Sequence, residues 1–98
     1  MREEEIDFVL QEGEGYRIEF KESVSHIEGE MVAFANSSGG KIFIGITDEH
    51  KVKGIKVTER LKSQLQNMAR TCDPPVKIIL ETIIFRDKEM LLVEVFEG

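Results

Sequence analysis

The chain is poor in several residue types that define common structural classes. Its 98 residues include one cysteine, Cys72, one tyrosine, Tyr16, and no tryptophan. A single cysteine cannot form an internal disulfide or build a metal cluster alone, so a reducing, cytoplasmic setting is the default expectation. Because most phenylalanines lie in apolar patterns, few aromatic platforms remain, which argues against a single-strand binder that works by base stacking.

The chain also lacks long hydrophobic runs. No apolar stretch approaches the roughly 20 residues that a membrane-spanning helix needs, and the N-terminus reads Met-Arg-Glu-Glu-Glu, unlike a signal peptide. The hydrophobic content of 41% suits one modest core, and the length suits one domain over residues 1–98. Since residues 95–98 leave a strand pattern abruptly, we expect the N-terminal domain of a longer protein, with no membrane association.

Charge is distributed unevenly along the chain. The net charge is −6, but residues 51–70 carry six bases and one acid, whereas residues 1–22 carry eight acids and three bases. An acidic domain is a poor candidate for nonspecific binding of nucleic acid, yet a local basic segment is compatible with it. The candidate phosphate contacts are Lys51, Lys53, Lys56, Arg60 and Lys62; the alternative is that they form a solvated surface.

One stretch, residues 33–48 with the sequence AFANSSGGKIFIGITD, is predicted to organise the fold. Gly39 and Gly40 let the chain leave a helix through positive φ and reverse tightly. The apolar residues within Lys41–Thr47 are too continuous for a strand that is wetted on one face. We therefore predict a central strand that is covered on both faces.

The remaining pattern predicts a mixture of helices and strands. Apolar spacing predicts helices over residues 3–10, 25–36 and 58–72, the second starting at a capping box of Ser25 and Glu28, the third capped by Thr58. Strands are predicted over residues 16–21, 52–57, 76–85 and 90–96. The predicted fold is α+β, a mixed sheet of about five strands covered by two to three helices.

Acidic residues near the central strand indicate possible chemistry. Glu19 and Lys21 are two positions apart on a predicted strand, so their side chains share one face. Phosphodiester-cleaving enzymes use such a pair, with the carboxylate on a divalent metal and the lysine offsetting charge. Glu14 and Asp48 could converge on Glu19, and three carboxylates suit Mg²⁺ or Mn²⁺. The alternatives are an exposed Glu/Lys pair and a turn aspartate.

Other motifs are weaker. The spacing Gly40-x4-Gly45 invites a phosphate-binding loop, but Ile46 replaces the lysine and the intervening residues favour a strand, so nucleotide binding is disfavoured. His26 and His50 lack partners at zinc-ligand spacing and are interpreted as a cap-region and a turn histidine.

These residues together carry a family resemblance. The pattern Glu14-x4-Glu19-Phe20-Lys21, then AFANSSGG, IFIGITD and Gly54-Ile55, resembles the Schlafen AlbA-like DNA-binding domain family, over about Gly13 to Phe96. The resemblance implies the N-terminal domain of a bacterial or archaeal transcriptional regulator that binds DNA or RNA. In such proteins ATPase-like or winged-helix segments often follow.

A second activity is implied by the animal Schlafens, in which the resembling domain is an endoribonuclease that acts on structured RNA such as tRNA. Its two glutamates and one aspartate, which work with a divalent metal, fall on Glu14, Glu19 and Asp48, with Lys21 assisting. Thr47 stands where the family often has a further acid. The animal enzymes pair two such lobes, so a single lobe would need a homodimer to form an equivalent groove.

Overall fold

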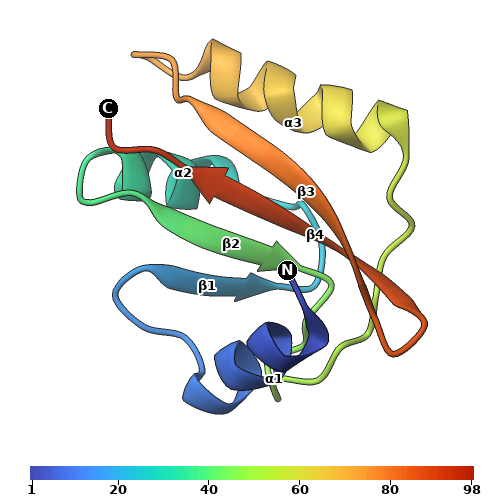
Figure 1. The fold of residues 1–98 in the computed structure, drawn as a ribbon. Coiled ribbons are helices and arrows are strands. Elements are labelled where there is room, and N and C mark those ends of the chain that lie inside the picture. Colours follow the sequence, from blue (N-terminus) through green and yellow to red (C-terminus); the bar gives the residue numbers. More distant parts are fainter.

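The structure, a computed structural model, describes residues 1–98 as three helices and one four-stranded sheet (Figure 1). The elements, in chain order, are α1 (Glu3–Glu12), β1 (Ile18–Lys21), α2 (Glu28–Ala35), β2 (Gly40–Ile44), α3 (Glu59–Thr71), β3 (Ile78–Phe85) and β4 (Lys88–Val95). The strand order is β1-β2-β4-β3, and only the β1–β2 pair is parallel. The predicted α+β class with a mixed sheet is therefore confirmed. None of the helices is both long and apolar enough to cross a bilayer.

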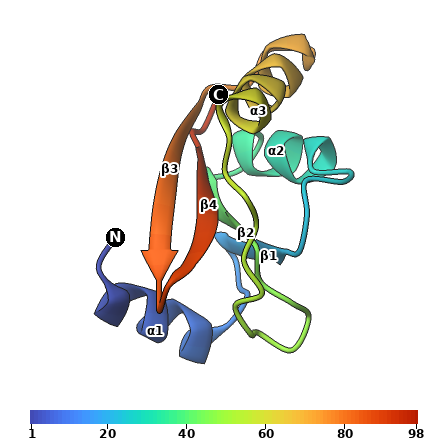
Figure 2. The ribbon, with the colours of Figure 1, turned by 90° about the vertical axis from the view of Figure 1, so that its right-hand side faces the viewer.

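Helices cover the sheet from both sides. Figure 2 shows α2 and α3 together on one face, where they enclose Ile42 and Ile44 of β2 in a larger core cluster. Phe43 points to the opposite face and packs in a smaller cluster with Ile6 of α1. The side chains of Ile42, Phe43 and Ile44 are each 0% exposed, so the predicted burial of this strand on both faces is confirmed. Each such side chain contributes about 1.5–3 kcal/mol by burial.

The fifth strand that the sequence predicts over residues 52–57 is not formed. Its only β contact is an isolated bridge from Val52 to Ile46. Gly54 has a φ of 86° and donates its N–H to the carbonyl of Gly45 at 2.9 Å. The preceding N–H donates to the same carbonyl, so two consecutive donors share one acceptor and no ladder can form.

The helix starts give one correct and one wrong prediction. Thr58 caps α3 as predicted, because its hydroxyl accepts the N–H of Leu61 at 3.0 Å. Ser25 does not cap α2, which begins only at Glu28. His26 has a φ of 59°, and this left-handed residue separates Ser25 from the helix.

The first strand is shorter than the predicted segment of residues 16–21. Tyr16 was expected on the buried face, but it precedes β1 and is 77% exposed. Ile18 is half-buried and Phe20 is buried, as the alternating pattern predicts. The C-terminal hairpin of β3 and β4 is confirmed, with the ends moved by one to two residues.

The bend between α2 and β2 depends on its two glycines. Gly39 has a φ of 77°, and a Cβ there would lie 2.7 Å from the carbonyl oxygen of Val95. Gly40 lies against the ring of Phe34, which a Cβ would approach to 2.6 Å. The predicted double-glycine bend is therefore enforced both by backbone conformation and by close packing.

We predict that Gly39→Ala lowers the free energy of unfolding by about 1–3 kcal/mol, because alanine strains the positive φ and meets backbone atoms. Gly29→Ala is the matched control: Gly29 lies within α2 with nothing within 4 Å of an added Cβ. That change should raise stability by about 0.5–1 kcal/mol. Urea unfolding measures both, and equal effects at the two glycines would contradict the close packing at the bend.

Candidate functional site

The candidate site is built on the open edge of β1. This strand is the end of the sheet beyond β2, so one side of its backbone has no strand partner. The N–H of Phe20 donates instead to Oε2 of Glu14 at 3.0 Å. Glu14 lies in the glycine-containing loop between α1 and β1, and this hydrogen bond holds its carboxylate beside the strand.

Glu19 and Lys21 lie on one face of β1, as their spacing predicts. The register pairs Glu19 with Ile42 and Lys21 with Ile44, so both side chains lie on the face that α2 and α3 cover. The ammonium of Lys21 is 3.2 Å from Oε1 of Glu30 on α2, and about a quarter of each side chain is exposed. Lys21 is therefore engaged by α2 as well as lying near Glu19.

Glu14 and Glu19 form a carboxyl pair with separated pKa values. Burial raises the pKa of Glu19 to about 7, and the hydrogen bond to Glu14, its charge and the charge of Glu30 act in the same direction, against Lys21. The N–H of Phe20 lowers the pKa of Glu14, and the hydrogen bond with Glu19 adds to this effect. Glu19 therefore keeps its proton up to about pH 7, beside a Glu14 carboxylate that stays ionised. A carboxyl that titrates in this range is suited to general acid–base work.

The turn after β2 contributes a residue that the sequence interpretation missed. The ring of His50 packs edge-on against Phe20, with 5.0 Å between ring centroids, and its charge helps to lower the pKa of Glu14. His50 was interpreted only as a turn histidine, because neither its φ of 64° nor its packing is visible in the sequence. Glu30 was missed for a similar reason, since only the packing of α2 brings it to Lys21.

Asp48, the third predicted carboxylate, is not brought to the pair. It lies exposed in the same turn as His50, makes no side-chain hydrogen bond or ion pair, and is not among the groups that shift the pKa of Glu14 or Glu19. No group of three or more His, Cys, Asp or Glu side chains is placed to hold a metal ion. The structure therefore joins Glu14, Glu19 and Lys21 and leaves Asp48 outside.

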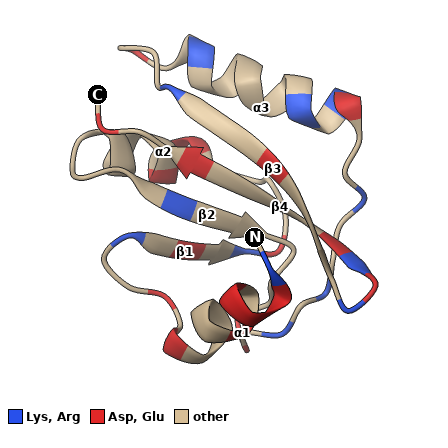
Figure 3. Ribbon diagram, in the orientation of Figure 1, with Lys and Arg blue, Asp and Glu red and all other residues tan.

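The predicted basic residues divide between two surfaces. One, which we call the loop–hairpin rim, joins the loop before α3 to the β3–β4 turn (Figure 3). A hollow of about 300 Å³ is lined by His50 together with Lys51, Arg86 and Lys88. An adjoining hollow of about 450 Å³ is lined by Lys53, Lys56 and Lys88 and by two acids, Asp87 and Glu89. The rim consists of Lys51, Lys53, Lys56, Arg86 and Lys88.

Ion pairs occupy two side chains of the rim. Lys53 lies 3.2 Å from Glu22, which directly follows β1, and Arg86 lies 3.2 Å from Asp7 of α1. Lys51 and Lys56 are exposed and make no ion pair. Sequence reasoning missed Arg86 and Lys88, which were interpreted only as hairpin-loop residues alternating with acids.

The other two predicted bases lie on α3. Arg60 lines a groove together with polar residues of its own helix. Lys62 lies 3.5 Å from Glu59 and faces β3. The structure thus gathers the three lysines of the loop and separates them from Arg60 and Lys62.

Comparison with known proteins gives a family and a fold. The sequence profile of the family described as Schlafen, AlbA_2 matches residues 14–98. None of the curated proteins matches this sequence.

Two solved structures have a similar fold. The N-terminal domain of a RecG-related protein from Nitrosomonas europaea, whose name refers to an ATP-dependent DNA helicase, has a TM-score of 0.72 at 22% identity and covers 100% of this chain. The DIP2311 protein from Corynebacterium diphtheriae has a TM-score of 0.65 at 14% identity over 97% of this chain. The chain spans 75% of the first structure and 25% of the second. At these identities the likeness shows the fold alone.

The raised pKa of Glu19 predicts a pH-dependent effect of Glu19→Gln. The folded chain keeps this proton up to about pH 7, whereas the unfolded chain releases it near 4.5, so the wild type loses stability as pH rises through this window. Glutamine has no proton to lose. At about pH 8 the free energy of unfolding of Glu19→Gln should exceed that of the wild type by about 1 kcal/mol, after allowance for solvent screening. At about pH 4 the difference in free energy of unfolding should be much smaller.

Urea unfolding across this pH range measures the difference. Glu4→Gln, on the exposed surface of α1, is the control for removal of one carboxylate. The same pH profile in both variants would contradict the assigned environment of Glu19.

Proposed function

This chain belongs to the Schlafen AlbA_2 family, and on that premise we propose that it is a nucleic-acid-binding domain of a longer transcriptional regulator. The observation that carries the proposal is the loop–hairpin rim, where five bases gather on a chain of net charge −6. The five bases outnumber Asp87 and Glu89, the two acids that line the larger hollow of the rim, and this local excess of positive charge favours approach of a polyanion.

The rim has the chemistry that phosphates require. Lys51 and Lys56 are free of ion pairs, and Lys88 contributes to both hollows, so a phosphate backbone would meet several cations in succession. Arg60 and Lys62 are proposed as outlying contacts on α3 for a longer nucleic acid. The helicase-related name of the Nitrosomonas neighbour is consistent with this class of partner. Either DNA or RNA satisfies the chemistry, because the proposed contacts are to phosphates.

Reversing two unpaired charges of the rim should weaken binding. We predict that the double variant Lys51→Glu, Lys56→Glu binds a labelled DNA or RNA duplex at least about tenfold more weakly, with a shallower dependence on salt because phosphate contacts are lost. Fluorescence anisotropy at several salt concentrations measures both effects.

The matched control for the rim is Arg70→Glu, Lys77→Glu, which changes the net charge equally at exposed positions outside the rim. Binding should weaken far less in this control. An equal loss in both double variants would mean that net charge alone governs binding and would refute the rim as the interface.

A second candidate function, a divalent-metal-dependent endoribonuclease, is favoured by one observation, the Glu14–Glu19 carboxyl pair. The donor set does not fit an ion held by three protein carboxylates. It fits Mg²⁺ or Mn²⁺ held by two carboxylates with water and substrate phosphate, an arrangement common for Mg²⁺.

In this proposal Glu14 and Glu19 hold the ion, which would polarise the scissile phosphate. Lys21 offsets negative charge on the same face of β1. The hydrogen bond from Phe20 keeps Glu14 in its ionised, metal-binding form, and His50 supports that form by its charge. Asp48 would have to move to become a third ligand.

The nuclease proposal is tested with purified chain, tRNA and Mn²⁺. We predict cleavage that falls at least about 100-fold in Glu19→Gln, the size of effect expected for a residue that takes part in the chemistry. Glu4→Gln should cleave as the wild type does. Equal cleavage by Glu19→Gln, or no cleavage by the wild type, would refute the nuclease proposal and leave the binding proposal in place.

A further inference from the structure

The last strand of the sheet, β3, has an unpaired backbone edge. It pairs with β4 on one side and with no strand on the other. The carbonyl of Lys77 accepts the N–H of Phe96 at 3.1 Å. This bond shows which residues of β3 direct their backbone N–H and C=O groups toward β4 and which direct them outward. Odd-numbered residues of β3 therefore bond to β4, and the backbone groups of Ile78, Leu80, Thr82 and Ile84 point outward.

The middle of this edge, from Ile78 to Ile84, has little protection against pairing. Natural edge strands are kept short, carry charges or proline, or are covered by another element. β3 has eight residues, with Glu81 its one charge and no proline. The Glu81 carboxylate is ion-paired with the N-terminal ammonium of Met1, and Glu3 of α1 accepts the outward N–H of Arg86, so the open part of the edge lies between them and α3. Ile79 is 51% exposed on one face of the strand and Ile84 is 56% exposed on the other.

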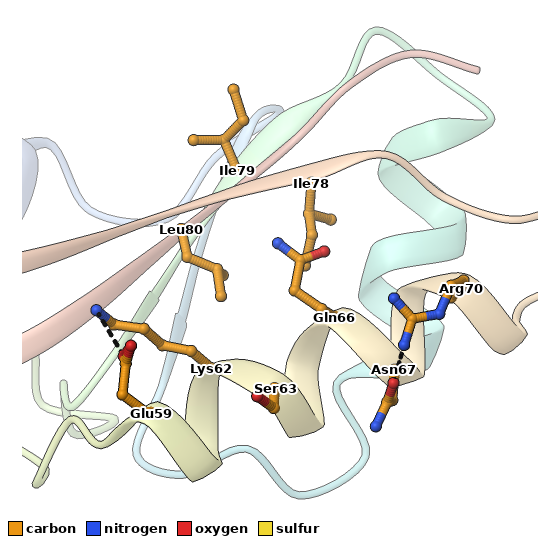
Figure 4. Close-up of a pocket in the computed structure, with 9 residues that line it drawn as sticks. All are labelled: Glu59, Lys62, Ser63, Gln66, Asn67, Arg70, Ile78, Ile79 and Leu80. Carbon is orange, nitrogen blue, oxygen red and sulfur yellow. Dashed lines mark hydrogen bonds and ion pairs between the residues drawn. The ribbon is translucent and has the colours of Figure 1, made fainter.

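A groove of about 620 Å³ runs between this strand and α3 (Figure 4). Ile78 and Leu80 point from β3 into the groove, whereas Ile79 points away from it. The α3 side of the groove carries polar residues, among them Lys62 and Gln66. An apolar floor with a polar rim is the usual anatomy of a protein interface.

We propose that the edge of β3 pairs antiparallel with β3 of a second copy, so that two four-stranded sheets become one continuous sheet. The two-fold axis of such a pair is perpendicular to the sheet, so residues opposite each other share a face. Registers centred on Glu81 or on Thr82 both use the outward backbone groups. Centring on Glu81 would bring two carboxylates together, each already ion-paired with the N-terminal ammonium of Met1, whereas centring on Thr82 keeps the two ion pairs apart.

The Thr82-centred register also places each exposed isoleucine, Ile79 and Ile84, opposite an apolar residue of the other copy. Ile84 of the partner subunit lies opposite Leu80, over the apolar floor of the groove. On the other face of the sheet, Ile79 lies opposite Phe85 of the partner subunit; the Phe85 ring is only 4% exposed, so this contact is the smaller of the two. The pairing of exposed Ile84 with Leu80, both from one chain, favours a second copy over an unrelated extended peptide as the occupant.

Sedimentation of the chain at graded concentrations tests the proposal. The wild type should dimerise below about 1 mM. Thr82→Pro removes an outward N–H that β4 does not use, and Ile84→Lys places a charge at the apolar contact. Both should raise the dimer dissociation constant at least about tenfold, whereas Phe8→Lys, at an exposed residue of α1, should not.

Amide exchange provides an independent readout. In concentrated wild-type chain the amides of Leu80, Thr82 and Ile84 should exchange more slowly than in dilute chain, and Ile84→Lys should abolish that difference. Circular dichroism checks that each variant is folded. A monomer at every concentration would overturn the proposal, as would a dimer that Thr82→Pro and Ile84→Lys leave unchanged. The Lys51→Glu, Lys56→Glu variant should still dimerise, so the result is independent of nucleic-acid binding.

Discussion

The burial of β2 on both faces is the constraint on which the rest of the structure depends. Ile42 and Ile44 complete the core beneath α2 and α3, while Phe43 completes the core on the side of α1. In the sheet, β2 lies between β1 and β4, so β1 is an edge strand with one unpaired side. The N–H of Phe20 on that side is satisfied by Glu14, so the position of the acidic pair follows from how the core is packed.

The elements that could be predicted are those set by local pattern. Continuous apolar residues identify β2, the two glycines identify its bend, and a threonine at the correct offset identifies the start of α3. The segment over residues 52–57 has a strand-like composition, but Gly45 and Gly54 lie close together. The N–H groups of Lys53 and Gly54 both donate to the carbonyl of Gly45, so they cannot form the regular hydrogen bonds of a strand pair. The partners of the acidic pair could not be read in the same way, because His50 and Glu30 reach it only through tertiary packing.

The candidate groups lie in two neighbouring regions of the fold. The acidic pair lies along β1, and the loop–hairpin rim lies around the segment that follows β2, linked to β1 by the ion pair of Lys53 with Glu22. Two carboxyl groups held this close are not stable as two bare anions, and a shared proton relieves the repulsion. A metal cation bound from solution would relieve the repulsion between the two carboxylates in the same way. The surfaces of the binding proposal and of the nuclease proposal therefore adjoin each other.

The packing of β2 and β1 holds Glu14 and Glu19 as a carboxyl pair with separated pKa values at the strand edge. Carbon-13 NMR of the side-chain carboxyl groups across a pH titration measures this directly. Glu19 should titrate with a pKa of about 7, and Glu14 should titrate below its ordinary value of 4.5. Two glutamates that both titrate near 4.5, without mutual dependence, would contradict this arrangement.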